Sequence, residues 1–139
     1  MTEIVHDDLF ATARTIAVVG LSDNPSRPSH EVAQVMQQAG FRIIPVNPRA
    51  AGKSILGEPC VSSLGEAAVP VDIVDCFRRS DEMAEVARAA VAMSPRPTVL
   101  WMQIGVVNEE AAQIARDAGI AVVQDRCIKI EYRAWKARR

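Results

Sequence analysis

Small polar residues and one arginine follow the first apolar run of the chain, in an order that suits anion binding. The apolar run ends at Gly20, and the polar residues that follow include Ser22, Asn24, Ser26, Arg27 and Ser29. A loop of this kind that leads into a helix can turn its backbone N–H groups inward, and the helix start adds partial positive charge. We therefore expect this loop to bind a phosphate group.

The same loop lacks most of the fingerprint of dinucleotide-binding proteins. Only Gly20 of the G-x-G-x-x-G pattern is present. Proteins that bind NAD usually place Asp or Glu after the second strand, where this chain has Asn47, followed by Arg49 and Lys53. Cationic groups at this place favour a phosphorylated ribose, which leaves NADP and coenzyme A (CoA) as ligands. The missing glycines count against NADP.

Five short apolar runs rich in Val and Ile are typical of strands buried on both faces of a sheet. They are residues 15–20, 41–46, 71–77, 98–102 and 120–124. Helical patterns separate them, which predicts an α/β fold: a Rossmann-like, doubly wound parallel sheet of five or six strands with helices on both faces. Residues 49–70 contain several Gly and Pro, which predicts loops around a short strand and one short helix. We expect a single domain over residues 1–139.

The ends of the later helices carry their own signals. Ser80 is predicted to cap the helix that contains Met83, and Asn108 to cap the next one. The last residues, 132–139, are basic with two aromatic side chains, and we expect a frayed, solvated terminus there.

Composition excludes several classes of protein. The formal net charge is −1, which does not favour nucleic acid, and no apolar run approaches the roughly 20 residues of a membrane span. The three cysteines Cys60, Cys76 and Cys127 lie far apart, without the spacing of a disulfide framework or a zinc site, so we predict no metal. We expect a cytoplasmic protein.

Six stretches resemble the small single-domain CoA-binding proteins of bacteria and archaea, which are similar to the CoA-binding domain of the succinyl-CoA synthetase α subunit. The stretches are residues 18–29, 43–48, 56–60, 72–79, 100–112 and 125–131. They run in order through nearly the whole chain. The resemblance implies a Rossmann-type fold that binds CoA or an acyl-CoA.

Carried over residue by residue, the resemblance also implies where CoA would lie. The loop from Gly20 and Ser22 through Arg27 to Ser29 would follow the phosphates. Asn47 and Pro48 would meet the adenosine, with Arg49 and Lys53 near the 3′-phosphate. Phe77 and Arg78 would flank the nucleotide, and Ile104 and Gly105 would line the path of the pantetheine arm.

No set of residues combines a nucleophile, a general base and an oxyanion site, so we predict binding without catalysis and name no catalytic residue. In the synthetase, a phosphorylated histidine in another domain carries the reaction, and this sequence has no counterpart of that domain. Two alternatives stay open: an NADP-dependent redox enzyme or sensor, and a regulatory module that docks an acyl-CoA enzyme. We expect Cys76 to be buried and inert. Cys127 lies between Arg126 and Lys129, whose positive charges could favour its thiolate, so a reactive Cys127 stays an open alternative.

Overall fold

A parallel sheet of five strands, in the order β2-β1-β5-β6-β7, forms the centre of the computed structural model, which describes residues 5–139, with side chains from Asp8 on. The strands are β1 (Thr15–Val19), β2 (Arg42–Val46), β5 (Ile73–Cys76), β6 (Val99–Met102) and β7 (Ala121–Val123). Each one lies inside an apolar run that the sequence predicts as a strand. The prediction of a Rossmann-like parallel sheet is therefore confirmed.

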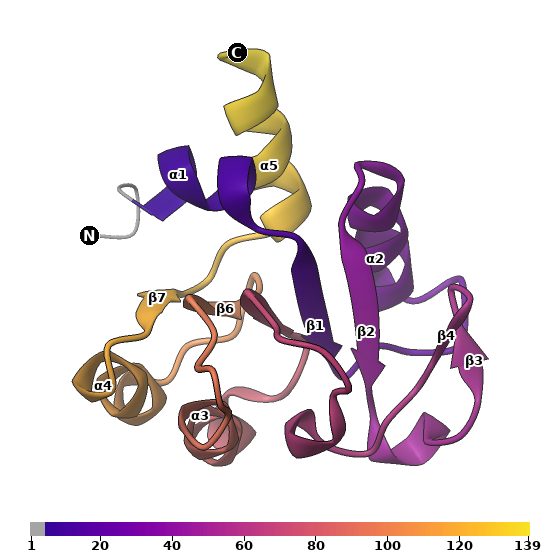
Figure 1. Ribbon diagram of the computed structural model, residues 1–139, viewed down its shortest axis with the longest axis horizontal. Coiled ribbons are helices and arrows are strands. Elements are labelled where there is room, and N and C mark those ends of the chain that lie inside the picture. Colours follow the sequence, from indigo (N-terminus) through magenta and orange to yellow (C-terminus); the bar gives the residue numbers. More distant parts are fainter. Residues whose placement is uncertain (1–4) are drawn as a thin grey trace.

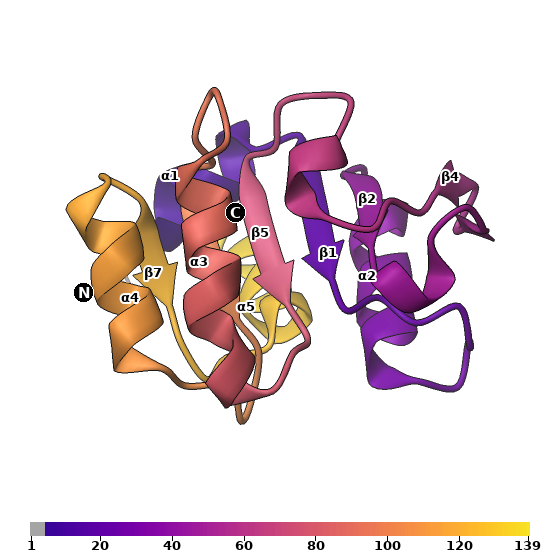
Figure 2. The same ribbon diagram turned by 90° about the horizontal axis from the view of Figure 1, so that it is seen from below.

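Helices cover both faces of this sheet, as Figures 1 and 2 show. One face carries α1 (Val5–Thr12), α2 (Pro28–Gln38) and α5 (Ile128–Ala137), and the other carries α3 (Met83–Val91) and α4 (Glu109–Asp117). Successive side chains of a strand point to opposite faces, so Ile73 packs in one hydrophobic core and Val74 in the other. In the part of the chain that the structure describes, no helix has the length and apolar character needed to cross a bilayer.

The strand order reverses between β1 and β5. From β1 the chain crosses to β2 at the sheet edge and then returns to β5 on the other side of β1. The two strand ends approach closely here: the Phe77 N–H donates to the carbonyl of Val19 at 2.8 Å. Gly20 has a φ of +88°, and a Cβ on it would overlap the carbonyl oxygen of Phe77. Ligand crevices in open parallel sheets form at such reversal points, beyond the carboxyl ends of the strands.

The segment between β2 and β5 packs against the free side of β2. It holds η1 (Pro48–Ala50), β3 (Ser54–Ile55), β4 (Glu58–Pro59) and η2 (Leu64–Glu66), each a single short turn or strand. The sequence predicts one short strand here, whereas the structure has two, β3 and β4, which pair antiparallel as a hairpin. This hairpin fixes the position of Lys53, whose carbonyl accepts from the Cys60 N–H at 2.8 Å.

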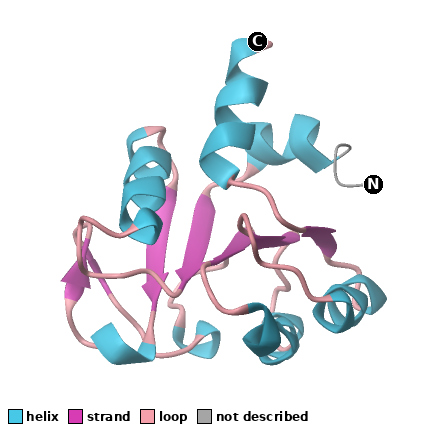
Figure 3. Cartoon of the chain, turned by 180° about the vertical axis from the view of Figure 1, so that it is seen from behind, coloured by secondary structure: helices cyan, strands magenta, loops and turns pink. Residues whose placement is uncertain are grey.

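The prediction of a frayed terminus at residues 132–139 is wrong. Most of this segment belongs to α5, and Trp135 is buried against the ring of Phe10, with centroids 5.8 Å apart. Figure 3 shows α1 and α5 on the same side of the sheet. Ile128, Tyr132 and Trp135 follow helical spacing, and this apolar face outweighs the basic residues between them.

Ser80 does not cap α3, contrary to the prediction. It begins η3 (Ser80–Glu82), the turn before that helix, and its hydroxyl accepts from the Val107 N–H at 3.0 Å. It therefore holds the loop between β6 and α4. Asn108 caps α4 as predicted, because its Oδ1 accepts from the Ala111 N–H at 2.9 Å.

Candidate functional site

Three neighbouring cavities follow the carboxyl edge of the sheet and form one groove. The first, about 460 Å³, lies between the loop after β1, the start of α2 and the turn after β2, and we call it the polar arm. The third, about 620 Å³, lies between α2, α5 and the loop after β6, and we call it the apolar arm. A smaller cavity of about 290 Å³ lies beside them, and Phe77 lines all three.

Most of the predicted site residues line this groove, although they come from four separate loops. Those in the polar arm are Gly20, Ser22, Arg27, Ser29, Asn47, Arg49, Lys53 and Phe77. Pro48 and Arg78 line the small cavity, and Ile104 lines the apolar arm. The three others, Asn24, Ser26 and Gly105, line none of these cavities.

Positive charge in the polar arm comes from Arg27, Arg49 and Lys53. The Lys53 ammonium pairs with the carboxylate of Asp23, with 3.1 Å between Nζ and Oδ2. Arg27 and Arg49 are both exposed, and within the described residues neither guanidinium has an ion-pair or hydrogen-bond partner. These two arginines are therefore available to an anion without breaking an existing contact.

The loop after β1 uses its own side chains to satisfy its backbone. The hydroxyl of Ser29 accepts from the Ser22 N–H, the Ser22 hydroxyl from the Asn24 N–H, and the Asn24 Oδ1 from the Ser26 N–H, each at 3.0 Å. These three N–H groups do not point freely into the polar arm, contrary to the simple expectation for a phosphate loop.

Asn47 joins the two loops that form the polar arm. Its Nδ2 donates to the carbonyl of Leu21 at 2.9 Å, and its Oδ1 accepts from the Arg49 N–H at 3.0 Å. The side chain thus fixes the turn after β2 against the loop after β1. This holds Arg49 at the wall of the polar arm, which Arg27 also lines.

The apolar arm has hydrophobic walls and a polar rim. Its apolar side chains include Ile104 and Ile130, which are 63% and 54% exposed. At the rim the Lys129 ammonium donates to the Glu31 carboxylate at 2.9 Å and so joins α5 to α2. Ile130 was not among the residues predicted to line the site. It is an apolar residue that does not share the helical spacing of the buried residues Ile128 and Trp135, and this mismatch could have marked it as exposed.

Two of the three thiols are held in the neutral form. Burial, and then the neighbouring Asp75 carboxylate, raises the pKa of the Cys76 thiol well above its ordinary value. Burial also raises the pKa of Cys60, whose Sγ donates to the carbonyl of Asn47 at 3.5 Å. Cys127 differs from both in its position, because it lines the apolar arm and they line no part of the groove. All three are free thiols, and among the described residues no cluster of His, Cys, Asp or Glu is placed to hold a metal ion.

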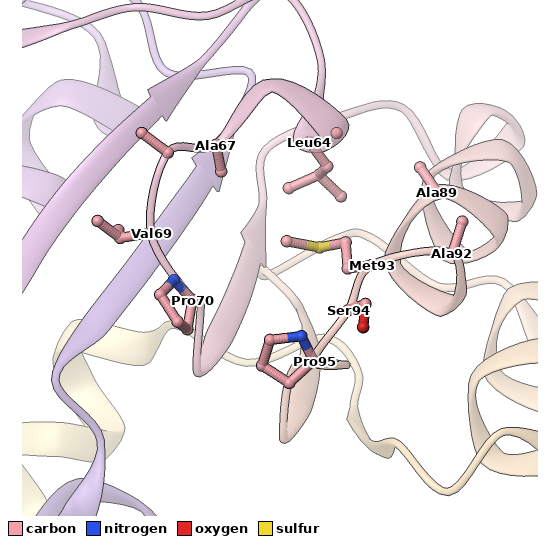
Figure 4. Close-up of a pocket in the computed structure, with 11 residues that line it drawn as sticks. Leu64, Ala67, Val69, Pro70, Ala89, Ala92, Met93, Ser94 and Pro95 are labelled. Carbon is pink, nitrogen blue, oxygen red and sulfur yellow. The ribbon is translucent and has the colours of Figure 1, made fainter.

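A separate cavity of about 310 Å³ opens at the amino ends of the strands, beside the C-terminal end of α3 (Figure 4). Leu64, Val69, Met93 and Pro95 are among its lining side chains, and none of the lining residues carries a charge. It therefore lacks the groups needed to bind an anion.

The sequence of most of the chain resembles a known protein family. The sequence profile of the CoA binding domain matches residues 14–133. The chain belongs to this family. The predicted resemblance to small CoA-binding proteins is thereby confirmed.

Proteins of similar length resemble almost the whole chain. The chain is 44% identical to YneT of Bacillus subtilis over 129 residues, which are 93% of each protein. A structure from Thermus thermophilus is 36% identical, with a TM-score of 0.91, over 97% of this chain and 99% of that one. A Pyrococcus horikoshii protein is 26% identical, with a TM-score of 0.90, over 98% of this chain and 93% of that one.

The fold also occurs inside a larger enzyme. The dinucleotide forming acetyl-coenzyme A synthetase 1 of Ca. Korarchaeum cryptofilum has a TM-score of 0.68 at 21% identity. The match covers 84% of this chain but only 27% of the synthetase. At this identity the likeness shows the fold alone.

Proposed function

We propose that this chain acts as a single CoA-binding domain that holds CoA, or a short acyl-CoA, in the groove and catalyses no reaction of its own. One observation carries the proposal: a cationic polar arm, with two arginines that have no partner within the described part of the chain, opens into an apolar arm. CoA has the matching division, with three phosphates at the nucleotide end and a pantetheine arm at the other. Family membership supports the same ligand.

The two arms suggest how the ligand is oriented. The phosphates meet Arg27 and Arg49, since arginine suits bidentate phosphate contacts. The 3′-phosphate forms an ion pair with Lys53, which replaces the ion pair between Lys53 and Asp23. The pantetheine arm then passes Phe77 and lies against Ile104. The remaining proposed contacts are Gly20, Ser22, Asn24, Ser26, Ser29, Asn47, Pro48, Arg78 and Gly105.

A thermal-shift series with CoA, acetyl-CoA, dephospho-CoA, NADP and NAD at matched concentrations tests this function. A ligand at 100 times its Kd stabilises the fold by about 2.7 kcal/mol, which raises Tm by several degrees. We expect CoA and acetyl-CoA to raise Tm, and dephospho-CoA to raise it less because it lacks the 3′-phosphate.

Other outcomes would contradict the proposal in distinguishable ways. A shift with NADP alone would make the chain an NADP-binding protein on the same fold. No shift with any of the five ligands would favour a module that docks an acyl-CoA enzyme.

A further inference from the structure

Cys127 is placed differently from the other two cysteines. It is 8% exposed and lines the apolar arm, whereas Cys60 and Cys76 line none of the groove cavities. We propose that Cys127 undergoes thiol–disulfide exchange with CoA disulfide bound in this groove and keeps one CoA as a mixed disulfide, so that the protein stores CoA covalently under oxidising conditions. This proposal rests on the function proposed above.

A buried amide beside Cys127 points to a ligand at the same wall. Gln103 is 5% exposed and lines the apolar arm. Its Oε1 accepts from the Ile128 N–H at 3.0 Å, which places the amide against the residue that follows Cys127. Within the described residues its NH₂ group has no hydrogen-bond partner. Among the described residues, this nitrogen is not one of the buried side-chain atoms that lack a partner, so water in the apolar arm can reach it, and a ligand carbonyl can replace that water as the acceptor.

The pantetheine arm carries the carbonyl that this donor needs. Its last amide carbonyl is separated from the thiol by only the amide nitrogen and one ethylene unit. When that carbonyl accepts from the Gln103 NH₂, the thiol is brought to the Cys127 side of the cavity. The ethylene unit then contacts Val106 and Ile130, which are apolar walls of the arm. Gln103 is a positioning residue in this arrangement, and Cys127 is the reacting residue.

The reaction is a thiol–disulfide exchange whose co-reactant is the disulfide of CoA. The Cys127 sulfur loses its proton and attacks one sulfur of the CoA disulfide. A new S–S bond forms between Cys127 and that CoA while the old S–S bond breaks. The second CoA leaves as a thiolate and takes up the proton. Two thiol–disulfide partners are exchanged, with no net electron transfer to any other group.

Intact-mass spectrometry of the reduced, desalted protein incubated with CoA disulfide tests this proposal. We expect one CoA adduct per chain, located on Cys127 by peptide mapping and removed by dithiothreitol. Cys60→Ser, the matched control, should form the adduct at the wild-type rate, and Cys127→Ser should form none. Acetyl-CoA, whose thiol is blocked, should slow the reaction by competition. Gln103→Leu should slow it about tenfold while leaving the rate with glutathione disulfide unchanged.

Failure of this proposal can be separated from failure of the proposed function. If acetyl-CoA raises Tm but CoA disulfide gives no adduct, or an adduct on Cys60 or Cys76, the covalent step is wrong and CoA binding stands. If neither acetyl-CoA nor CoA raises Tm and no adduct forms, both are wrong. Equal rates with CoA disulfide and glutathione disulfide would also overturn the proposal, because they would show an unselective surface thiol.

Discussion

Arg27 and Arg49 lie on two different loops and line the same cavity, and neither guanidinium has a partner among the described residues. Replacing either arginine should therefore remove one charge-assisted contact to a phosphate, which contributes about 1.5–3 kcal/mol of binding free energy. We expect Arg27→Ala and Arg49→Ala each to raise the Kd for CoA by roughly 10- to 150-fold, as measured by calorimetry. Arg88→Ala, on α3 and outside the groove, is the control and should bind CoA as the wild type does. Unchanged affinity in both groove variants would mean that the phosphates lie elsewhere.

Gly20 tests how closely β1 and β5 approach each other. Gly20→Ala places a Cβ both at positive φ and on the carbonyl of Phe77. Gly119→Ala is a matched control, because Gly119 has a φ of +84° but open space around its Cβ position. Urea unfolding should show about 1–3 kcal/mol lost in the control. The loss in Gly20→Ala should be larger by about 1–3 kcal/mol, and equal losses would argue against the close approach.

Asp75 gives the stability of the fold a predictable dependence on pH. It is buried in β5, and among the described residues its Oδ1 has no hydrogen-bond partner. Burial raises its pKa well above the ordinary value, against a smaller opposite effect of the Cys76 amide. A carboxyl with a raised pKa in the folded state keeps its proton there after the unfolded chain has lost it. The free energy of unfolding therefore falls as pH rises above about 4, the pKa of an unperturbed Asp.

Asp75→Asn removes this titration, because an amide does not ionise. We expect the variant to be more stable than the wild type by about 1–3 kcal/mol at neutral pH, with a smaller gain near pH 4. Urea unfolding at both pH values measures this difference. Asp117→Asn, an exposed carboxyl on α4, should show no such pH-dependent gain. A gain of the same size at both pH values would show that ionisation of Asp75 is not the cause.

At the scale of elements, α5 links the core to the groove. One end of it carries Trp135, whose indole lies 4.6 Å from the Arg139 guanidinium carbon and packs against Phe10, while Ile130 lines the apolar arm. Trp135→Ala should cost about 3–5 kcal/mol of stability, the usual range for a buried Trp. Arg133→Ala, an exposed neighbour, should change stability by less than about 0.5 kcal/mol. Equal small losses in denaturant unfolding would restore the picture of a frayed terminus.

The sheet was predictable from the sequence, whereas half of the groove was not. A strand buried on both faces must be apolar throughout, so runs such as residues 71–77 stand out without any tertiary information. The polar arm follows, because loops after parallel strands meet at one edge. The apolar arm depends on α5, whose apolar face is interrupted by basic residues. Nothing local to Gln103 says that its amide meets Ile128, 25 residues further along the chain.

At the scale of the whole molecule, the groove gathers residues that are far apart in sequence, from Gly20 to Ile130. Its walls come from both crossovers that flank the reversal point between β1 and β5, and from α5. Only the folded chain has this groove, so a ligand that spans both arms stabilises the complete fold rather than one loop. Protection of amides in β1 and β5 should rise together when CoA binds.

The two margins of the sheet share a property that bears on association between copies. On the outer side of β2, the carbonyl of Pro45 accepts from the Val61 N–H, and the Asn47 N–H donates to Val61. Pro45 is itself an imino acid, so at this position the strand has no N–H to offer to an added strand. The opposite margin, β7, is only three residues long. The folded chain is therefore a poor template for strand addition, and amyloid-like stacking would require it to unfold first.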